Sequence, residues 1–161
     1  MNAVGIDVSK GKSMIAIMRP FGEVVASPFE VTHTDSELSD LAKTLTSLHG
    51  ETKVILEYTG SYYQPIAYVL HEAGLFVSAV HAKLIHDYGN NTIRRVKTDK
   101  ADAIKIANCG LSNWLKLPEH VPEDDIRRML KAFSRQYTKY IKVKITLKNN
   151  FIALTARPFP V

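Results

Sequence analysis

Val4-Gly5-Ile6-Asp7-Val8-Ser9-Lys10 is an apolar, β-branched run that is interrupted by one carboxylate, that of Asp7. Runs of this kind are typical of strands, and a carboxylate among buried strand residues is costly unless something neutralises it. The same conflict recurs in Val54-Ile55-Leu56-Glu57-Tyr58-Thr59-Gly60, where Glu57 follows a short apolar strand pattern. These two stretches therefore predict strands that each carry an acidic side chain near the end.

A third patch, Lys97-Thr98-Asp99-Lys100-Ala101-Asp102-Ala103, places two acids three residues apart at the predicted start of a helix, so that they share a face. If this helix packs across the sheet, all four acids converge. Converging carboxylates repel one another unless divalent cations bridge them, and hard oxygen ligands suit Mg²⁺ or Mn²⁺ rather than zinc. Two such ions about 3.5–4 Å apart would support phosphodiester cleavage.

Each acid also has a simpler interpretation when it is taken alone. Asp7 is equally well explained as a turn residue after a strand, and Glu57 as a strand end in solvent. Acids in the first turn of a helix, such as Asp99 and Asp102, commonly complement the helix dipole. The combination favours a site, because the four acids occur at the element ends expected of one fold.

The surrounding pattern predicts an α/β fold with a mixed five-stranded sheet flanked by helices, followed by a long C-terminal helix. Three strands in an antiparallel meander come first, and βαβ units follow; Pro28 indicates an edge strand or a bulge. A helix capped by Thr34 or Asp35 is expected to end at Gly50, and Thr98 is the expected cap of the acidic helix. The predicted strands cover 3–8, 13–18, 23–31, 53–57 and 75–80, and the other helices 61–73, 82–87 and about 98–111.

Residues 118–125 are the predicted linker, and residues 126–155 a long amphipathic helix. Its apolar heptad seam is interrupted only by Lys144, which favours coiled-coil pairing or packing back on the domain. The seam positions are Ile126, Leu130, Phe133, Tyr137, Tyr140, Lys144, Leu147, Phe151 and Leu154. Ile141, Val143 and Ile145 alternate with lysines, so a strand is the less favoured alternative there.

Composition limits the class of protein. The chain has 161 residues, of which 45% are apolar and 23% charged, and these values suit one globular domain, either alone or with an appendage. Cys109 is the only cysteine, so neither an intrachain disulfide nor a thiolate-rich zinc site is expected. No segment approaches the roughly 18 apolar residues that span a bilayer, and no leader pattern is present, so the prediction is a cytoplasmic protein without a membrane partner.

The basic residues are compatible with a polyanionic partner, although a moderate positive charge is also common in proteins without one. The formal net charge is +5, and no Asp or Glu occurs from Ile126 to the C-terminus. From charge alone, a solvated helix face is the favoured interpretation there. A flexible solvated loop explains Arg94, Arg95, Lys97 and Lys100 about equally well, and packing against the following helix is expected for at least one of Tyr58, Tyr62 and Tyr63. The candidate nucleic-acid-binding residues are Lys10, Tyr62, Arg94, Arg95, Lys97, Lys100, Arg127, Arg128 and Arg135.

The three acidic patches, in this order and spacing, resemble the motifs of the DEDD transposases of the IS110 insertion-sequence family, relatives of the Piv-type DNA invertases. The resemblance covers residue 3 to about residue 155, and Lys-Thr-Asp-x-x-Asp-Ala is its most specific part. It implies an RNase H-like (RuvC-like) catalytic domain over residues 1–117 with Mg²⁺ or Mn²⁺. It also implies DNA as substrate, a structured guide RNA from the same element, and Asp7, Glu57, Asp99 and Asp102 as the catalytic and metal-binding residues.

The C-terminal part departs from that family pattern. Members continue through a coiled coil into a second domain with a serine nucleophile, whereas this sequence ends at Val161. The expectation is therefore an N-terminal fragment or truncated product that forms homo-oligomers through its last helix and is incomplete alone. The alternatives are a non-catalytic module that binds nucleic acid and self-associates, and an actin-like kinase or ATPase. The latter is disfavoured because such enzymes need two lobes.

Overall fold

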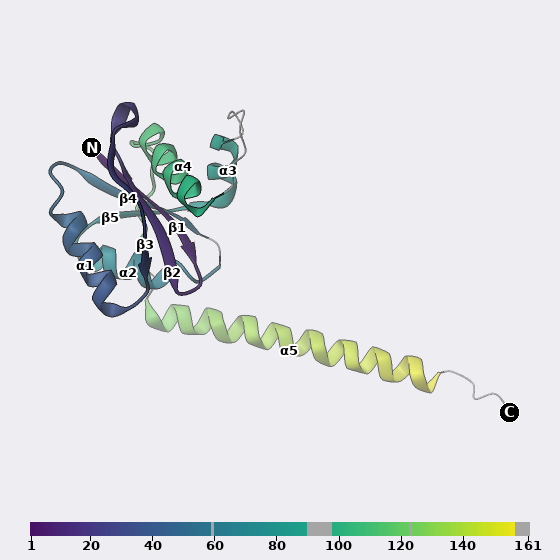
Figure 1. The fold of residues 1–161 in the computed structure, drawn as a ribbon. Helices are drawn as coiled ribbons and strands as arrows, with labels where there is room; N and C mark the ends of the chain where they lie inside the picture. The colour runs from purple at the N-terminus through teal and green to yellow at the C-terminus, as the bar shows by residue number, and fades with distance from the viewer. Residues whose placement is uncertain (59, 90–97, 123, 157–161) are drawn as a thin grey trace. The chain divides into compact units, whose positions relative to one another are not determined.

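A computed structural model of the chain describes residues 1–58, 60–89, 98–122 and 124–156. Five strands form one mixed sheet in the order β3-β2-β1-β4-β5 (Figure 1). The first three strands form an antiparallel meander, and β4 and β5 add parallel strands beside β1. The strands are β1 (Asn2–Ser9), β2 (Lys12–Met18), β3 (Val24–Thr32), β4 (Thr52–Tyr58) and β5 (Phe76–His81). The predicted mixed sheet is confirmed.

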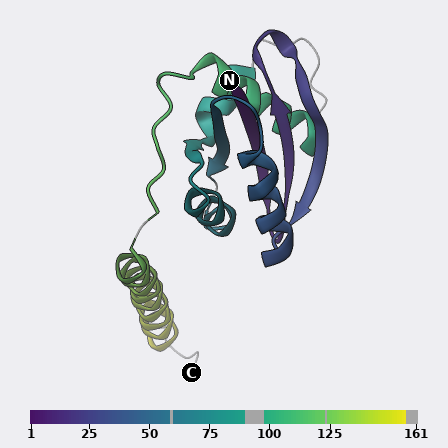
Figure 2. The same ribbon diagram turned by 90° about the vertical axis from the view of Figure 1, so that its left-hand side faces the viewer.

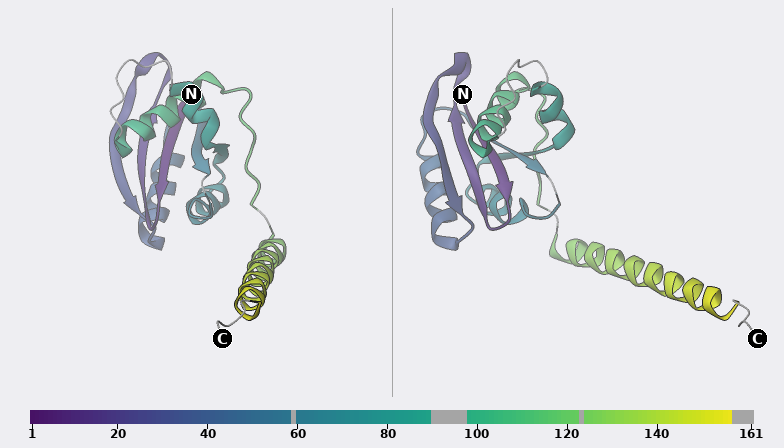
Figure 3. Two further views of the ribbon diagram at one scale, coloured as in Figure 1. Left: turned by 90° about the vertical axis from the view of Figure 1, so that its right-hand side faces the viewer. Right: turned by 45° about the vertical axis from the view of Figure 1, so that its right-hand side comes forward.

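Helices cover both faces of this sheet. Helices α1 and α2 lie on one face and α3 and α4 on the other, as the turned views show (Figures 2 and 3). A short 3-10 turn, Pro20–Gly22, joins β2 to β3. The helices of this part of the chain are α1 (Asp35–Thr46), α2 (Gln64–Glu72), α3 (Ala82–Gly89) and α4 (Asp99–Ser112).

The period of two along β1 divides its side chains between two cores. Val4 and Ile6 are fully buried in the core that α1 and α2 cover. Ala3 belongs to the second core, which α4 covers, and Gly5 lies against the backbone of α4 at Ala103 and Ala107. Because successive strand residues point to opposite faces, Asp7 lies on the α4 face with Ala3 and Gly5.

The edge strand β3 has the irregular register that Pro28 predicts. Ile15 pairs with Phe29, whereas Ile17 pairs with Ala26, so β3 has one more residue than β2 between these two pairs. A second shift follows before Met18 pairs with Val24. Proline cannot donate to a strand ladder, which explains its position at an edge and beside a bulge.

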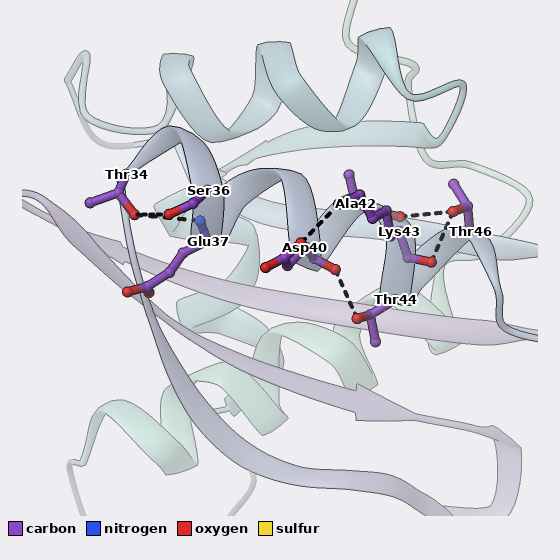
Figure 4. Close-up of polar contacts among 8 residues, drawn as sticks. All are labelled: Thr34, Ser36, Glu37, Asp40, Ala42, Lys43, Thr44 and Thr46. Carbon is purple, nitrogen blue, oxygen red and sulfur yellow. Dashed lines mark hydrogen bonds and ion pairs between the residues drawn. The ribbon is translucent and has the colours of Figure 1, made fainter.

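Two helix boundaries differ from the predicted ones. Helix α1 begins at the expected cap, where Thr34 accepts a hydrogen bond from the Glu37 amide, but it ends at Thr46 rather than near Gly50 (Figure 4). The Thr46 hydroxyl bonds back to the Ala42 and Lys43 carbonyls, and such local bonds compete with the helix. Helix α2 begins at Gln64, not Ser61, with Pro65 in its first turn.

The chain divides into two compact units, Met1–Pro122 and a second that starts at Glu123. The second unit contains α5 (Asp125–Thr155), a helix of 31 residues. The predicted long C-terminal helix is thereby confirmed, and the strand alternative at Ile141–Ile145 is wrong. The eight apolar residues of the predicted seam are 63–68% exposed on α5. Among the described helices, none has the length and apolar character that crossing a membrane requires.

Candidate metal and nucleic-acid site

The parallel pairing of β1 with β4 brings the first two motif acids to neighbouring positions. Ile6 is level with Leu56 in this register, so Asp7 and Glu57 are the next residues along. Both side chains are half-buried. Ile55 packs in the core under α4, and Glu57 is two residues further along the same strand. By strand alternation, both acids therefore lie on the α4 face near the carboxyl ends of their strands.

Helix α4 brings the other two acids toward the same place. Thr98 caps it by accepting a hydrogen bond from the Ala101 amide at 3.2 Å, so that Asp99 and Asp102 both fall in its first turn. The helix crosses β1 at Gly5, and the residue Gly110 lies against Ile55 of β4. This crossing places the first turn over the carboxyl end of β1, where Asp99 and Asp7 line one cleft.

That cleft is small, about 50 Å³. It holds more charge than the motif acids alone supply, because it also contains Lys12 and Glu30. Asp7 pairs across β1 and β2 with Met14, and Met14 pairs across β2 and β3 with Glu30. Cross-strand partners point to the same face, so Asp7 and Glu30 belong to one row of side chains. The cleft is lined by Asp7, Ser9, Lys12, Ser13, Met14, Glu30 and Asp99.

Lys12 is the cation among the described residues that line this cleft. Its Nζ lies 2.8 Å from Oε2 of Glu30, and the two side chains are 51% and 48% exposed. The hydrogen bond to Glu30 and the charge of that carboxylate, with a smaller contribution from Asp99, raise the pKa of Lys12 above its ordinary value. Lys12 therefore stays protonated throughout the physiological range, within the field of at least two carboxylates.

The donor chemistry of the four acids fits a hard divalent cation. Asp7 and Asp99 already share the cleft, whereas Glu57 lies on β4, which pairs with β1, and Asp102 lies in the same first turn of α4 as Asp99. Within the described ranges, no three His, Cys, Asp or Glu side chains are grouped closely enough to hold a metal ion. Binding would therefore need Glu57 and Asp102 to turn toward Asp7 and Asp99, which their half-buried positions at element ends allow.

The predicted nucleic-acid-binding residues fall into three places. Lys10 lies exposed in the turn between β1 and β2, and Lys100 is exposed on the first turn of α4, so both border the acidic edge. Tyr62, 52% exposed, lies in the turn that leads to α2. Arg127, Arg128 and Arg135 belong to α5 in the second unit. Arg94, Arg95 and Lys97 lie outside the described residues.

The tyrosines beside Glu57 have different environments. The Tyr63 ring packs against those of Tyr58 and His120 at centroid distances of 5.8 and 5.5 Å, and its side chain is half-buried. Tyr58 also meets His81 edge-on at 5.8 Å but stays 45% exposed. Packing thus explains Tyr63, as expected for at least one of these tyrosines.

Sequence reasoning missed Lys12, Glu30 and the pair Ser13–His33. The Ser13 hydroxyl and Nε2 of His33 lie 2.8 Å apart beside the cleft, and burial lowers the pKa of His33. The register of the β1–β2 hairpin was the available signal for Lys12. Because Ser9 is opposite Lys12 and Asp7 is opposite Met14, Lys12 lies on the same face of the sheet as Asp7. Without the bulged register of β3, no pattern in the sequence places Glu30 in the same row.

Comparisons with known proteins agree with this geometry. A family model described as a transposase, that of the IS110-type DEDD transposases, matches residues 4–160. The structure is similar to that of Thermus thermophilus RuvC, with a TM-score of 0.54 and 14% identity over 71% of this chain and 95% of RuvC. It is also similar to T. thermophilus RuvC in complex with a Holliday junction substrate, with a TM-score of 0.51, 14% identity and the same coverage. No curated protein sequence matches. The RuvC-like, RNase H-like fold is confirmed.

Proposed function

The chain belongs to the IS110-type DEDD transposase family, and we propose that its first unit cleaves DNA phosphodiester bonds during transposition of its insertion element. Asp7, Glu57, Asp99 and Asp102 would hold Mg²⁺ or Mn²⁺. These four carboxylates are the acids of the family motifs, and they come from β1, β4 and the first turn of α4. When bound, the ions activate the attacking oxygen and stabilise the leaving oxygen.

The observation that carries this proposal is the cleft shared by Asp7 and Asp99. These residues are 92 positions apart in sequence (99 − 7), and the crossing of α4 over Gly5 brings them together. Parallel strands fix the backbones of Asp7 and Glu57 relative to each other. The capped first turn of α4 supplies the other pair, and its positive dipole end favours a phosphate there.

DNA is the proposed partner of this edge. Lys10 and Lys100 border it and are exposed, so they can contact phosphates on either side of the acids. The similarity in fold to RuvC, which has been solved with a Holliday junction substrate, supports a branched DNA. A structured guide RNA from the same element and self-association through α5 complete the proposed assembly, and the exposed apolar seam of α5 supports the latter.

Metal-dependent cleavage of branched or single-stranded DNA tests the proposal. With Mg²⁺ or Mn²⁺, we expect Asp7→Asn and Asp102→Asn to lower the rate by at least about a hundredfold, since each removes a ligand worth several kcal/mol of charge stabilisation. Asp40→Asn is the matched control, because Asp40 is an exposed acid on α1, on the other face of the sheet. Equal rates in the wild type and both site variants would remove the assignment.

A non-catalytic binding module is the second candidate, because no acid occurs from Ile126 to the C-terminus. It predicts salt-dependent DNA or RNA binding that survives loss of all four acids, with no cleavage under either metal. Binding that depends on the acids and the metal would instead favour the nuclease.

A further inference from the structure

Among the cleft residues outside the transposase motifs, two are charged, namely Lys12 of β2 and Glu30 of β3. We infer that Lys12 is a phosphate-binding residue of this cleft and that Glu30 is the positioning residue that holds its ammonium at the rim until nucleic acid arrives. The inference rests on the proposed function, because it assumes that a phosphodiester enters the cleft.

Geometry places Lys12 next to the acids without burying it. Lys12 is opposite Ser9 in β1, two residues along from Asp7, and is thus on the same face of the sheet. On β3 it is opposite Thr32, so it reaches diagonally to Glu30, which is opposite Met14. The Nζ–Oε2 distance of 2.8 Å sets the direction of the side chain. A cation held beside carboxylates, with half its surface in water, can contact both the cleft and a passing backbone.

The charges in the cleft make the position of the Lys12 ammonium depend on whether a metal ion and a phosphate are bound. Asp7, Asp99 and Glu30 contribute three negative charges, against one positive charge from Lys12, among the described residues that line it. Without a bound cation, these carboxylates attract the Lys12 ammonium toward the cleft. If Asp7 and Asp99 held a divalent cation, that attraction would be cancelled and the ammonium of Lys12 would be repelled. Lys12 would then exchange its exposed partner Glu30 for an incoming phosphate and would contact that phosphate from the β2 side.

The Lys12–Glu30 ion pair is easy to exchange. Half-exposed pairs of this kind contribute little to stability, because solvent screens them and ordering both side chains costs entropy. The pair therefore serves to orient rather than to stabilise. This separates Lys12 from Lys53, whose Nζ donates to the Trp114 carbonyl and lies over the Phe76 and Trp114 rings in a mostly buried setting.

The first test measures binding of a four-way DNA junction against KCl concentration, at constant Ca²⁺. We expect Lys12→Met to weaken binding and to reduce the slope of log K against log[salt] by about one unit, the signature of one lost phosphate contact. Lys12→Arg should restore the wild-type slope. Lys43→Met is the control, because Lys43 also forms an exposed ion pair, with Asp40 at 2.9 Å on α1 (Figure 4). Equal slopes for Lys12→Met and Lys43→Met would overturn the inference.

The second test measures Mn²⁺ binding by calorimetry without DNA. We expect Lys12→Met to bind Mn²⁺ about threefold or more tightly than the wild type, since a repelling charge is gone, and Glu30→Gln to bind it more weakly. A purely structural role would not shift the Mn²⁺ affinity of the two variants in opposite directions, so shifts in the same direction would overturn the inference.

Both tests are independent of cleavage. An inactive wild type with the slope change intact would remove the proposed nuclease and leave the phosphate contact. A wild type that cleaves DNA, with an unchanged slope in Lys12→Met, would remove only the inference.

Discussion

Gly5 has no side chain, and this absence sets the distance between the two parts of the candidate site. A Cβ atom at Gly5 would collide with the Ala103 carbonyl oxygen and the Ala107 amide nitrogen of α4. Both are backbone atoms, so they cannot move aside as the end of a flexible side chain can. The whole helix would have to shift. Because α4 carries Asp99 and Asp102, the closeness of these acids to Asp7 depends on a glycine two residues before Asp7.

We expect Gly5→Ala to lower the free energy of unfolding by about 3 kcal/mol, since overpacking against backbone cannot be relieved by a rotamer change. Urea denaturation measures the loss. Gly11→Ala is the matched control: Gly11 has a φ of +78° but nothing near its Cβ position, so only the strain of the left-handed conformation, about 1 kcal/mol, is expected. Equal losses in the two variants would contradict the role of close packing at Gly5.

At the scale of the element, α5 of the second unit differs from the longer helices of the first unit. Helices α1, α2 and α4 each bury apolar residues against the sheet. The apolar seam of α5 stays exposed along the 31 residues of the helix, with Lys144 as its one charged member. A helix of this length gains most of its stability from packing an amphipathic face, which supports the proposed pairing with a second copy.

We expect Lys144→Leu to strengthen self-association and Leu130→Lys to weaken it, each by about tenfold or more in the dissociation constant, because a charge inside a coiled-coil seam must be desolvated. Sedimentation equilibrium measures both effects. Lys139→Leu makes the same chemical change as Lys144→Leu at an exposed position off the seam, and it should leave the association constant unchanged. If Lys139→Leu has the same effect as Lys144→Leu, general hydrophobicity and not the seam drives association.

At the scale of the whole molecule, the candidate site exists only in the folded state. Its acids come from two strands and one helix, and its added charges from two further strands. A ligand that binds all of these together binds the folded chain and not the unfolded one, so it must stabilise the fold by mass action. Trp114, the only tryptophan, is buried in the core under α4 and reports on the first unit.

We expect Mn²⁺ at about 100 times its dissociation constant to stabilise the first unit by about 2.7 kcal/mol, which raises Tm by about 5–10 °C. The Trp114 fluorescence follows the transition, and chelation of the metal should reverse the shift. Asp7→Asn should lose most of it, whereas Asp40→Asn on α1 should keep it. A Tm that does not respond to Mn²⁺ in the wild type would argue against metal binding at these acids.

Much of this molecule follows from the sequence because the signals are local. Alternation and capping predicted the five strands, α4 and its Thr98 cap, and the three motifs predicted the transposase family that the comparisons show. The errors are local as well. The end of α1 at Thr46 and the start of α2 at Gln64 depend on side-chain hydrogen bonds and on Pro65, which compete with the helix within one turn.

By itself, the sequence determined which residues are acidic, which segments are strands and helices, and to which family the chain belongs. Only the tertiary structure decided that Asp7 and Asp99 share a cleft with Lys12 and Glu30. The physical reason is that neighbours within one element are set by its fixed period, whereas neighbours across elements depend on strand register and helix crossing. Here the bulged pairing of β2 with β3 and the close approach of α4 to Gly5 decide them.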